Sequence, residues 1–229
     1  MKKISILGST GSVGTQCLDI ISEFEDEFEV ISLSAGNNED KLKEQLFKYK
    51  PKYYLSNSET IHEFGKRVET FEELLKIDES DLIVIALSGI SGFKPVLLSI
   101  EQGRNIALAN KESLVACGDL LNELCKKNNS NIFPLDSEHS AIWQCLKDED
   151  LSSIDSIVLT ASGGSLRDIP YQELSKITPN QVLDHPTWSM GNKITVDSAT
   201  LINKVFEIQE ASNLFGIPLD KIDVLFHNE

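Results

Sequence analysis

Short runs rich in branched apolar residues alternate with amphipathic stretches through the first half of the chain. Residues 40–49 and 113–127, for example, carry leucines at helical spacing. This alternation is typical of β-α-β units, in which right-handed helical crossovers join parallel strands. We therefore predict an α/β fold with a doubly wound parallel sheet in residues 1–133. The strands that the pattern predicts are residues 4–7, 28–33, 53–55, 82–87, 105–109 and 132–135.

A glycine-rich turn, GSTGSVG, follows the first predicted strand and opens a helix with apolar residues over 13–21. Glycines there permit a tight turn and let backbone N–H groups approach a pyrophosphate at the helix N-terminus. The pattern departs from G-x-G-x-x-G, because Ser9 stands where that pattern has a glycine. An ordinary strand–helix turn is the alternative, but the place of the loop at the head of an alternating domain favours a Rossmann-like dinucleotide site. The residues predicted to bind the nucleotide here are Gly8, Ser9, Thr10, Gly11, Ser12 and Val13.

The end of the second predicted strand bears on the choice between NAD and NADP. NAD-binding domains usually place a carboxylate there, on the ribose 2′-hydroxyl. Here a neutral Gly36-Asn37-Asn38 follows the strand, and the first carboxylate is Glu39. This uncharged pocket favours NADPH. The alternative is that Glu39 or Asp40 turns back to read the ribose, which would favour NADH.

The second half of the chain lacks the regular alternation of strands and helices. A strand is predicted within residues 154–161, and residues 165–192 are rich in Pro, Thr, Asn and Gly with little periodicity. A loop of that length in a compact domain is usually either a functional lid or disordered. A helix is expected from an N-cap at Ser198 to Gly216, followed by a strand in the last run of the chain. We predict that residues 134–229 form an incomplete α+β catalytic domain.

Two carboxylates, Asp136 and Glu138, stand two positions apart after a predicted strand. If the chain is still extended there, both side chains point to the same side. A hard cation such as Mg²⁺ or Mn²⁺ would relieve their repulsion, and Glu207 on the polar face of the Ser198 helix is the natural third ligand. The alternative is that Asp136 caps the following helix as part of a capping box. His139, on that helix, is expected to be structural.

Hydroxyl, amide and ammonium groups gather in two motifs. Ser162 follows a predicted strand, and Ser198, Asn203 and Lys204 surround the start of a helix. Together with the helix dipole they would suit a phosphate monoester. The alternative for each is ordinary capping or a solvated helix surface. Opposite the polar face, the helix has a broad apolar face, made of Leu201, Ile202, Val205, Phe206 and Ile208.

Composition limits the classes of partner. The net charge of −15 argues against nucleic-acid binding, because phosphate contacts need a basic surface. With 41% hydrophobic and 25% charged residues, and an N-terminal run too short for a signal peptide, the chain is expected to be soluble and cytoplasmic, without a transit peptide. The four cysteines have no metal-binding spacing and are expected to be reduced.

Five stretches together carry a resemblance to a known family. They are GSTGSVG, ALANKESLV (107–115), PLDSEHSAIWQ (134–144), LTASGG (159–164) and HPTWSMGNKITVDSATLINKVFEIQEA (185–211). The sequence resembles the 1-deoxy-D-xylulose 5-phosphate reductoisomerases of non-mevalonate isoprenoid biosynthesis. The resemblance implies an oxidoreductase that isomerises 1-deoxy-D-xylulose 5-phosphate and reduces the product with NADPH to 2-C-methyl-D-erythritol 4-phosphate. It also implies one divalent cation, Mg²⁺ or Mn²⁺.

The resemblance implies roles for individual residues. The metal ligands would be Asp136, Glu138 and Glu207, and the catalytic residues Lys111, Glu138 and His185. The substrate would be bound by Ser137, Ser162, His185, Trp188, Ser198, Asn203, Lys204 and Glu207, with His185, Trp188 and Met190 on the lid. Further contacts to the cofactor would come from Gly36, Asn37, Asn38, Asn110, Glu112 and Gly191.

The sequence also departs from the family. Asn37 stands where many members have a basic residue, which weakens the expected preference for NADPH. Family members form homodimers and extend well past residue 229, so the chain is expected to be truncated at its C-terminus. One alternative is therefore an inactive NADP-binding remnant. Another is a semialdehyde dehydrogenase, whose nucleotide loop is similar. That chemistry requires a nucleophilic cysteine beside a histidine base, which the sequence does not offer convincingly.

Overall fold

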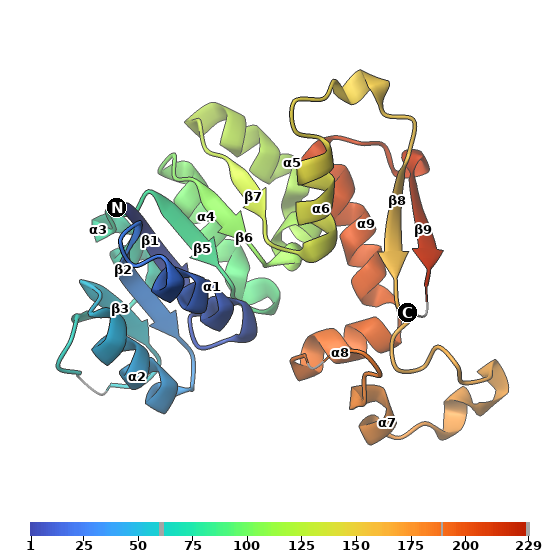
Figure 1. Cartoon of the computed structure of the whole chain (residues 1–229), viewed down its shortest axis with the longest axis horizontal. Coiled ribbons are helices and arrows are strands. Elements are labelled where there is room, and N and C mark those ends of the chain that lie inside the picture. Colours follow the sequence, from blue (N-terminus) through green and yellow to red (C-terminus); the bar gives the residue numbers. More distant parts are fainter. Residues whose placement is uncertain (60–61, 189, 228–229) are drawn as a thin grey trace. The chain divides into compact units, whose positions relative to one another are not determined.

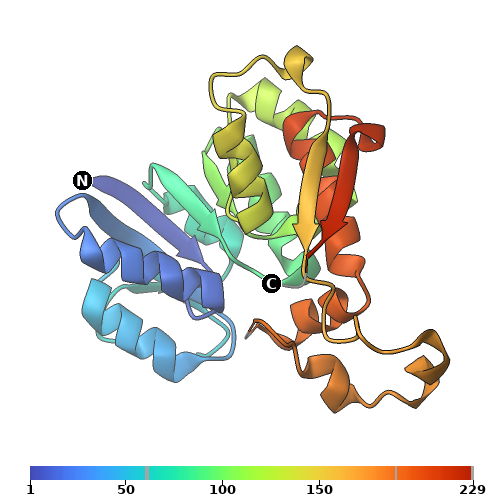
Figure 2. The same cartoon turned by 45° about the vertical axis from the view of Figure 1, so that its right-hand side comes forward.

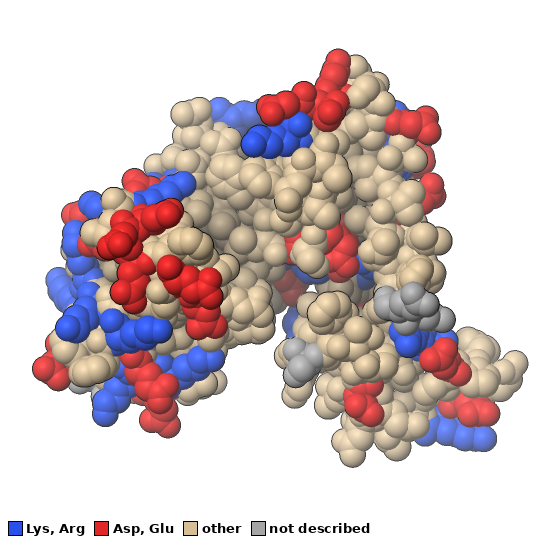
Figure 3. Space-filling view, viewed as in Figure 1, with Lys and Arg blue, Asp and Glu red and all other residues tan. Residues whose placement is uncertain are grey.

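The computed structural model describes residues 1–59, 62–188 and 190–227 of the chain. The chain divides into two compact units, Met1–Asp136 and Ser137–Glu229. Among the described residues, none of the helices combines the length and the apolar character that crossing a membrane requires. On the face shown in Figure 3, Lys and Arg side chains are interspersed with Asp and Glu rather than forming a continuous basic surface.

The first unit alternates strands and helices, as predicted (Figure 1). Its elements are β1 (Lys2–Leu7), α1 (Ser12–Glu23), β2 (Phe28–Ala35), α2 (Glu39–Tyr49), β3 (Tyr53–Ser56), β4 (Lys66–Val68), α3 (Phe71–Ile77), β5 (Leu82–Ile85), the 3₁₀-helix η1 (Gly89–Gly92), α4 (Phe93–Glu101), β6 (Ile106–Leu108), α5 (Lys111–Asn128) and β7 (Ile132–Pro134).

The described strands of this unit form one seven-stranded sheet in the order β4-β3-β2-β1-β5-β6-β7, and every neighbouring pair is parallel. The chain runs outward from β1 to β4 and then returns to the other side of β1. The predicted doubly wound α/β sheet is therefore confirmed. In such a sheet, ligands bind outside the carboxyl ends of the strands where the order reverses, which here is between β1 and β5.

Helices cover both faces of this sheet, with α1 and α2 on one face and α3 and α4 on the other (Figures 1 and 2). Both faces of the central strands are therefore buried, as in other parallel sheets. Ile6, Leu33 and Tyr54 are fully buried within the resulting core. The strands consequently lack the alternation of apolar and polar residues that a half-exposed sheet would show.

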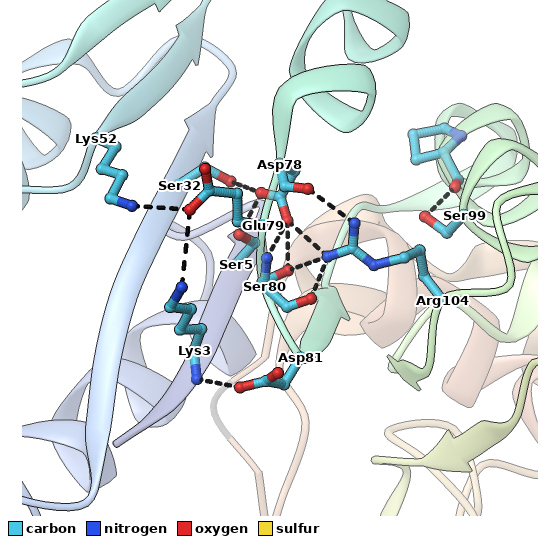
Figure 4. Close-up of polar contacts among 11 residues, drawn as sticks. Lys3, Ser5, Ser32, Lys52, Asp78, Glu79, Ser80, Asp81, Ser99 and Arg104 are labelled. Atoms are coloured by element: carbon cyan, nitrogen blue, oxygen red, sulfur yellow. Dashed lines mark hydrogen bonds and ion pairs between the residues drawn. The ribbon is translucent and has the colours of Figure 1, made fainter.

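Two serines in this core need polar partners, because Ser5 on β1 and Ser32 on β2 are both fully buried. Both donate to Asp78 Oδ2, at 2.5 Å from Ser5 Oγ and 2.8 Å from Ser32 Oγ (Figure 4). Ser80 and Arg104 complete the network: the Ser80 amide is 2.9 Å and Arg104 Nη2 3.0 Å from Asp78 Oδ1. One carboxylate thus joins β1, β2 and the segments around β5 and β6.

The Asp78 network predicts an acid-dependent stability. Burial by itself raises the pKa of Asp78, but hydrogen bonds from Ser5, Ser80 and Ser32 lower it more, so the net pKa lies below its ordinary value. The carboxylate therefore stabilises the fold above its unfolded pKa of about 3.9, and this contribution is lost as the pH falls through the folded pKa.

Asp78→Asn is expected to lower the free energy of unfolding by about 3 kcal/mol at pH 7, since it leaves Arg104 without its charge partner. The free energy of unfolding of the variant should also decrease less than that of the wild type as the pH is lowered. Urea unfolding at several pH values measures both effects. Asp81→Asn is the control, because Asp81 is exposed and accepts one bond from the Lys3 amide. Equal losses in the two variants would contradict the prediction.

The second unit consists of helices and a two-stranded parallel pair, β8 and β9, which lie side by side in Figures 1 and 2. Ile142, Leu159, Ala211, Ile217 and Ile222 form its core. Its elements are α6 (Ser137–Cys145), η2 (Leu151–Ser153), β8 (Ile157–Ala161), η3 (Tyr171–Lys176), α7 (Pro179–Leu183), α8 (Asn192–Ala199), α9 (Ile202–Phe215), η4 (Leu219–Lys221) and β9 (Ile222–Phe226). The last two residues of the predicted final strand lie outside the described residues.

Several predictions for this unit are wrong in detail. Ser198 is not an N-cap but lies in the last turn of α8, and the following helix starts at Ile202 after Leu201, whose φ is +61°. The predicted lid is not wholly aperiodic, since it contains η3 and α7, and its residue Ser189 lies outside the described residues. The carboxylates Asp136 and Glu138 are not on one extended segment, because β7 ends at Pro134 and α6 begins at Ser137.

Burial on α9 does not follow hydropathy alone. Its buried residues are Lys204, Glu207, Glu210 and Ala211, whereas Ile202 and Val205 are 42% and 54% exposed. The charged face is inside because its groups find partners there. Of the apolar residues of this helix, Ile208 packs against the core of the second unit, whereas Ile202 and Val205 stay exposed.

Candidate functional site

The glycine loop after β1 keeps its shape because its glycines have no room for a side chain. Gly8 has a φ of +90°, and a Cβ there would lie 2.5 Å from the Ala86 carbonyl oxygen, at the end of β5. A Cβ on Gly14 would lie 2.3 Å from the Gly8 oxygen. The loop thus packs against its own helix at the point where the strand order reverses. Gly11 and Ser12, at the start of α1, are exposed, and no side chain caps this helix.

The start of α1 is therefore suited to an anion. The first amides of a helix have no intrahelical acceptor and carry the positive end of its dipole. Thr10 and Val13 are half-buried beside the exposed Gly11 and Ser12. The loop can bind a pyrophosphate through these backbone groups.

Ser9 contributes differently from the other loop residues. It is fully buried, and its Oγ donates to Gln45 Oε1 at 2.7 Å, while Gln45 Nε2 donates back to the Ser9 carbonyl at 2.9 Å. The side chain of Ser9 thus fastens the loop to α2. Gln45 is a supporting residue that the sequence reading missed, since a glutamine on an amphipathic helix gives no local signal of burial.

Gly14→Ala is expected to weaken NADPH binding by more than tenfold and to lower the free energy of unfolding by about 2 kcal/mol, because overpacking at this contact must displace the loop. Fluorescence titration and urea unfolding check the two effects. Glu23→Ala is the control, since Glu23 is an exposed residue at the other end of the same helix. Unchanged NADPH binding in Gly14→Ala would show that the close approach is not required.

The neutral turn after β2 is exposed at Gly36, Asn37 and Asn38. Asn38 caps α2, its Oδ1 accepting from the Lys41 amide at 3.2 Å. Asn57 Nδ2 lies 3.3 Å from Asn37 Oδ1, which brings the end of β3 to the same edge. The uncharged side chains of Asn37, Asn38 and Asn57 therefore lie where an NAD-binding domain would have its carboxylate.

The ALANKESLV stretch forms the junction between β6 and α5. Asn110 is fully buried, and its Nδ2 donates to the carbonyls of Leu87 and Gly89 at 2.8 and 2.7 Å. Its Oδ1 caps α5 by accepting from the Ser113 amide at 3.1 Å. Both the amide nitrogen and the amide oxygen of the Asn110 side chain are therefore bonded within the protein, so a contact from Asn110 to a cofactor would use its backbone. Glu112, the next predicted contact, is half-buried and lies 3.2 Å from Asn110 Nδ2.

Lys111 and Asp136 form an ion pair within the first unit. Lys111 is 7% exposed, and Asp136 is the last residue of the unit. The pair holds a lysine amine and a carboxylate together at the carboxyl ends of β6 and β7. The capping role considered for Asp136 stays open, but one of its carboxylate oxygens, Oδ2, is paired with Lys111.

In the second unit, two carboxylates converge on one ammonium. Lys204 Nζ on α9 is 3.1 Å from Glu138 Oε1 on α6, and it also pairs with Glu207. It donates to the Thr160 carbonyl on β8 at 2.6 Å, and Asn203 Nδ2 donates to Glu207 Oε1. We call Lys204, Glu138, Glu207 and Asn203 the Lys204 cluster.

The donor set of the Lys204 cluster fits a hard divalent cation. Glu207 is 2% exposed and Lys204 9%, whereas the Glu138 side chain is 25% exposed, so the cluster is only partly open to water. An ammonium already binds between them, which shows that the site accepts positive charge. Carboxylate oxygens are the ligands that Mg²⁺ and Mn²⁺ prefer. Asp136, the third ligand expected from the sequence, belongs to the first unit.

His139 joins the two helices that carry these carboxylates. It is fully buried, as predicted for a structural residue; its Nε2 lies 2.9 Å from the Glu207 carbonyl oxygen, and its Nδ1 3.5 Å from Glu210 Oε2. The bond to α9 comes from the residue that directly follows Glu138, so it fixes the spacing of Glu138 and Glu207. Glu210 was not singled out from the sequence, although it follows Glu207 by less than one helical turn.

The predicted phosphate residues are brought together by a glycine. A Cβ on Gly164, whose φ is +71°, would lie 2.4 Å from the Ser198 carbonyl oxygen. The turn after β8, which includes Ser162, therefore packs directly on the end of α8. Arg167 Nη1 donates to the Ser162 carbonyl at 2.9 Å and is a basic group near this turn that the sequence reading did not select.

The predicted lid residues are mostly exposed. Trp188 is 61% exposed, Gly191 is exposed and Met190 is half-buried. His185 Nδ1 accepts from the amides of Thr187 and Trp188, at 3.2 and 3.0 Å, which leaves Nε2 as the protonated nitrogen. Burial and then the charge of Arg167 lower the pKa of His185, so its ring is neutral at neutral pH.

Two family models match the chain. The model described as 1-deoxy-D-xylulose 5-phosphate reductoisomerase matches residues 4–118. The model described as the C-terminal domain of 1-deoxy-D-xylulose 5-phosphate reductoisomerase matches residues 132–215. The two matches fall on the two units in turn.

Individual relatives agree with these models. A 1-deoxy-D-xylulose 5-phosphate reductoisomerase of Thermoanaerobacter sp. (strain X514) is 46% identical over 238 residues, covering 99% of this chain and 62% of the relative. A crystal structure of DOX-P reductoisomerase in complex with NADPH, fosmidomycin and magnesium matches with a TM-score of 0.91 and 31% identity, over 100% of this chain and 62% of that one. The Zymomonas mobilis enzyme in complex with NADPH gives a TM-score of 0.88 and 32% identity, over 99% and 62%. The chain thus spans about 62% of the length of these relatives.

Proposed function

Because the chain belongs to the 1-deoxy-D-xylulose 5-phosphate reductoisomerase family, we propose that it isomerises 1-deoxy-D-xylulose 5-phosphate and reduces the product with NADPH to 2-C-methyl-D-erythritol 4-phosphate. The observation that carries the proposal is the Lys204 cluster. The buried carboxylate of Glu207 and the partly buried carboxylate of Glu138 meet around one positive charge, and a bound cation would relieve their mutual repulsion.

NADPH would bind at the carboxyl edge of the first unit. The exposed amides at the start of α1 would hold its pyrophosphate, and the neutral turn at Gly36, Asn37 and Asn38 would face the 2′-phosphate. The match to two relatives whose structures contain NADPH supports this assignment.

Asp136, Glu138 and Glu207 would hold one Mg²⁺ or Mn²⁺. A bound divalent cation would act as a Lewis acid that polarises the substrate's carbonyl and hydroxyl oxygens during rearrangement. His139 keeps Glu138 and Glu207 at a fixed spacing by bonding the Glu207 backbone. Lys111, paired with Asp136, would donate to the substrate's oxygens, and the hydroxyl of Ser137 would bind the substrate as well.

Groups around α8 and α9 would bind the phosphate end of the substrate. Ser162, Ser198 and Asn203 supply hydroxyl and amide donors, and Lys204 supplies a charge that can be shared with the carboxylates. His185 offers Nε2–H as a donor, and Trp188 offers an exposed apolar ring. Closed over a substrate, these lid residues would keep water from the aldehyde until it is reduced.

The test is oxidation of NADPH, followed by absorbance, after addition of 1-deoxy-D-xylulose 5-phosphate to the purified chain with Mg²⁺ or Mn²⁺. Turnover that chelation abolishes supports the proposal. NADPH binding without turnover would reject catalysis by this chain and leave a nucleotide-binding role. Turnover that survives chelation would remove the metal from the mechanism.

A further inference from the structure

Glu39, the first carboxylate after β2, is bound by two side chains from the β3 side of the sheet. Ser56 Oγ donates to Glu39 Oε2 at 2.6 Å, and His62 Nε2 bonds Glu39 Oε1. Ser56 is 5% exposed and the His62 side chain 7%. We call these three residues the Glu39 clamp.

The clamp turns the carboxylate away from the glycine loop. Ala35 at the end of β2 pairs with Ser56 on β3, so the partners of Glu39 lie on that side. On the other side of β2, the Gly8 amide donates to Ser34 Oγ at 3.0 Å, so the loop lies towards β1. The strand order β3-β2-β1 therefore separates the clamp from the loop that would hold a pyrophosphate.

The clamp is itself held in place. The His62 amide donates to the Tyr54 hydroxyl at 3.0 Å, and the two rings are 5.5 Å apart. Tyr54 is fully buried, so it gives the histidine a rigid support. Burial raises the pKa of Glu39, but the bonds from Ser56 and His62 lower it more, so the carboxylate is ionised at neutral pH.

A free carboxylate at this edge would have two effects on a nucleotide. It would accept a hydrogen bond from the ribose 2′-hydroxyl of NADH, and it would repel the 2′-phosphate of NADPH. Clamped towards β3, it can do neither, and the groups left at the edge are the uncharged Asn37 and Asn57. We infer that Ser56 and His62 are specificity-determining residues, which hold Glu39 out of the nucleotide site and so select NADPH over NADH. The inference rests on the proposed NADPH-binding function.

The experiment measures the dissociation constants of NADPH and NADH for the full chain by nucleotide fluorescence, with thermal unfolding in parallel. His62→Ala is expected to reduce the ratio of NADH to NADPH dissociation constants by at least about tenfold. The released Glu39 carboxylate would accept a charge-assisted hydrogen bond from the 2′-hydroxyl of NADH, and it would repel the 2′-phosphate of NADPH. NADH should bind more tightly and NADPH more weakly. Ser56→Ala, a smaller change, should move the ratio in the same direction.

The double variant Glu39→Gln/His62→Ala separates this effect from general damage. It lacks the carboxylate, so NADPH affinity should return to within about twofold of the wild type. If His62 had only a structural role, both His62→Ala and the double variant would bind NADPH and NADH more weakly, by the same factor. Asp40→Asn is the matched control: Asp40 is the exposed neighbour of Glu39, and its loss should leave the ratio unchanged.

Three results would overturn the inference. An unchanged ratio in both single variants, with NADPH still bound tightly, would reject the clamp and leave the proposed function intact. A shifted ratio in Asp40→Asn would make Asp40 the determinant. If the wild type bound neither nucleotide, the proposed function would fail and the inference with it.

Discussion

Glu207→Gln is expected to weaken Mn²⁺ binding by more than about 100-fold and to abolish NADPH-dependent turnover. Loss of a supporting group around a metal costs about 10- to 100-fold in affinity, and loss of a ligand charge should cost more. The glutamine keeps the shape of Glu207 and can still accept from Asn203. The fold should therefore persist, and the effect is confined to charge. Electron paramagnetic resonance of free Mn²⁺ gives the affinity.

Glu149→Gln is the matched control for this change, because Glu149 is an exposed glutamate of the same unit. Its Mn²⁺ affinity should equal that of the wild type. If Glu207→Gln bound Mn²⁺ as tightly as the wild type, Glu207 would not be a ligand, and the Lys204 cluster would have to be explained by the fold alone.

Lys204→Met is expected to lower the free energy of unfolding by about 3 kcal/mol in metal-free solution. Methionine keeps an apolar stem but removes the ammonium between Glu138 and Glu207, which leaves two carboxylates close together without the positive charge between them. Added Mn²⁺ should restore much of the loss, since a ligand that binds the folded state stabilises it. Urea unfolding with and without Mn²⁺ measures both effects.

Lys176→Met provides the comparison, because Lys176 is an exposed lysine of the same unit. It should change the free energy of unfolding by less than about 0.5 kcal/mol, whether or not Mn²⁺ is present. A Lys204→Met variant as stable as the wild type in metal-free solution would show that the ammonium does not hold the two carboxylates together.

The sheet of the first unit could be predicted because its signal is local and repeated. Leu82–Ile85 and Ile106–Leu108 lie within short apolar runs that begin directly after a polar residue, and each β-α unit contains one such run. The edge strand Lys66–Val68 was missed because three residues with two charges carry no strand pattern. Asp78 was missed for another reason: its partners Ser5 and Ser32 are far away in sequence.

The second unit was harder to predict because its burial follows charge pairing rather than hydropathy. Glu207 and Lys204 were chosen as functional residues, but the sequence did not show that they are buried while apolar residues such as Val205 are exposed. Hydrophobic periodicity cannot show that a charged face will find partners on two other elements. Ser198 was misplaced because a serine before an apolar run is typical of an N-cap. In the structure this serine instead lies in the last turn of the preceding helix, α8.

The pairing of β8 with β9 sets an order of events during synthesis. Val158 pairs with Asp223 and Ala161 with Phe226, so the first strand leaves the ribosome long before its partner. The strands of the first unit, by contrast, are complete once Pro134 has been made. Domains generally fold as they emerge, N-terminal first. The nascent chain therefore holds an unpaired, apolar β8 for the time needed to make some sixty further residues, about 3–12 s at typical translation rates. In that interval chaperones have access to the strand.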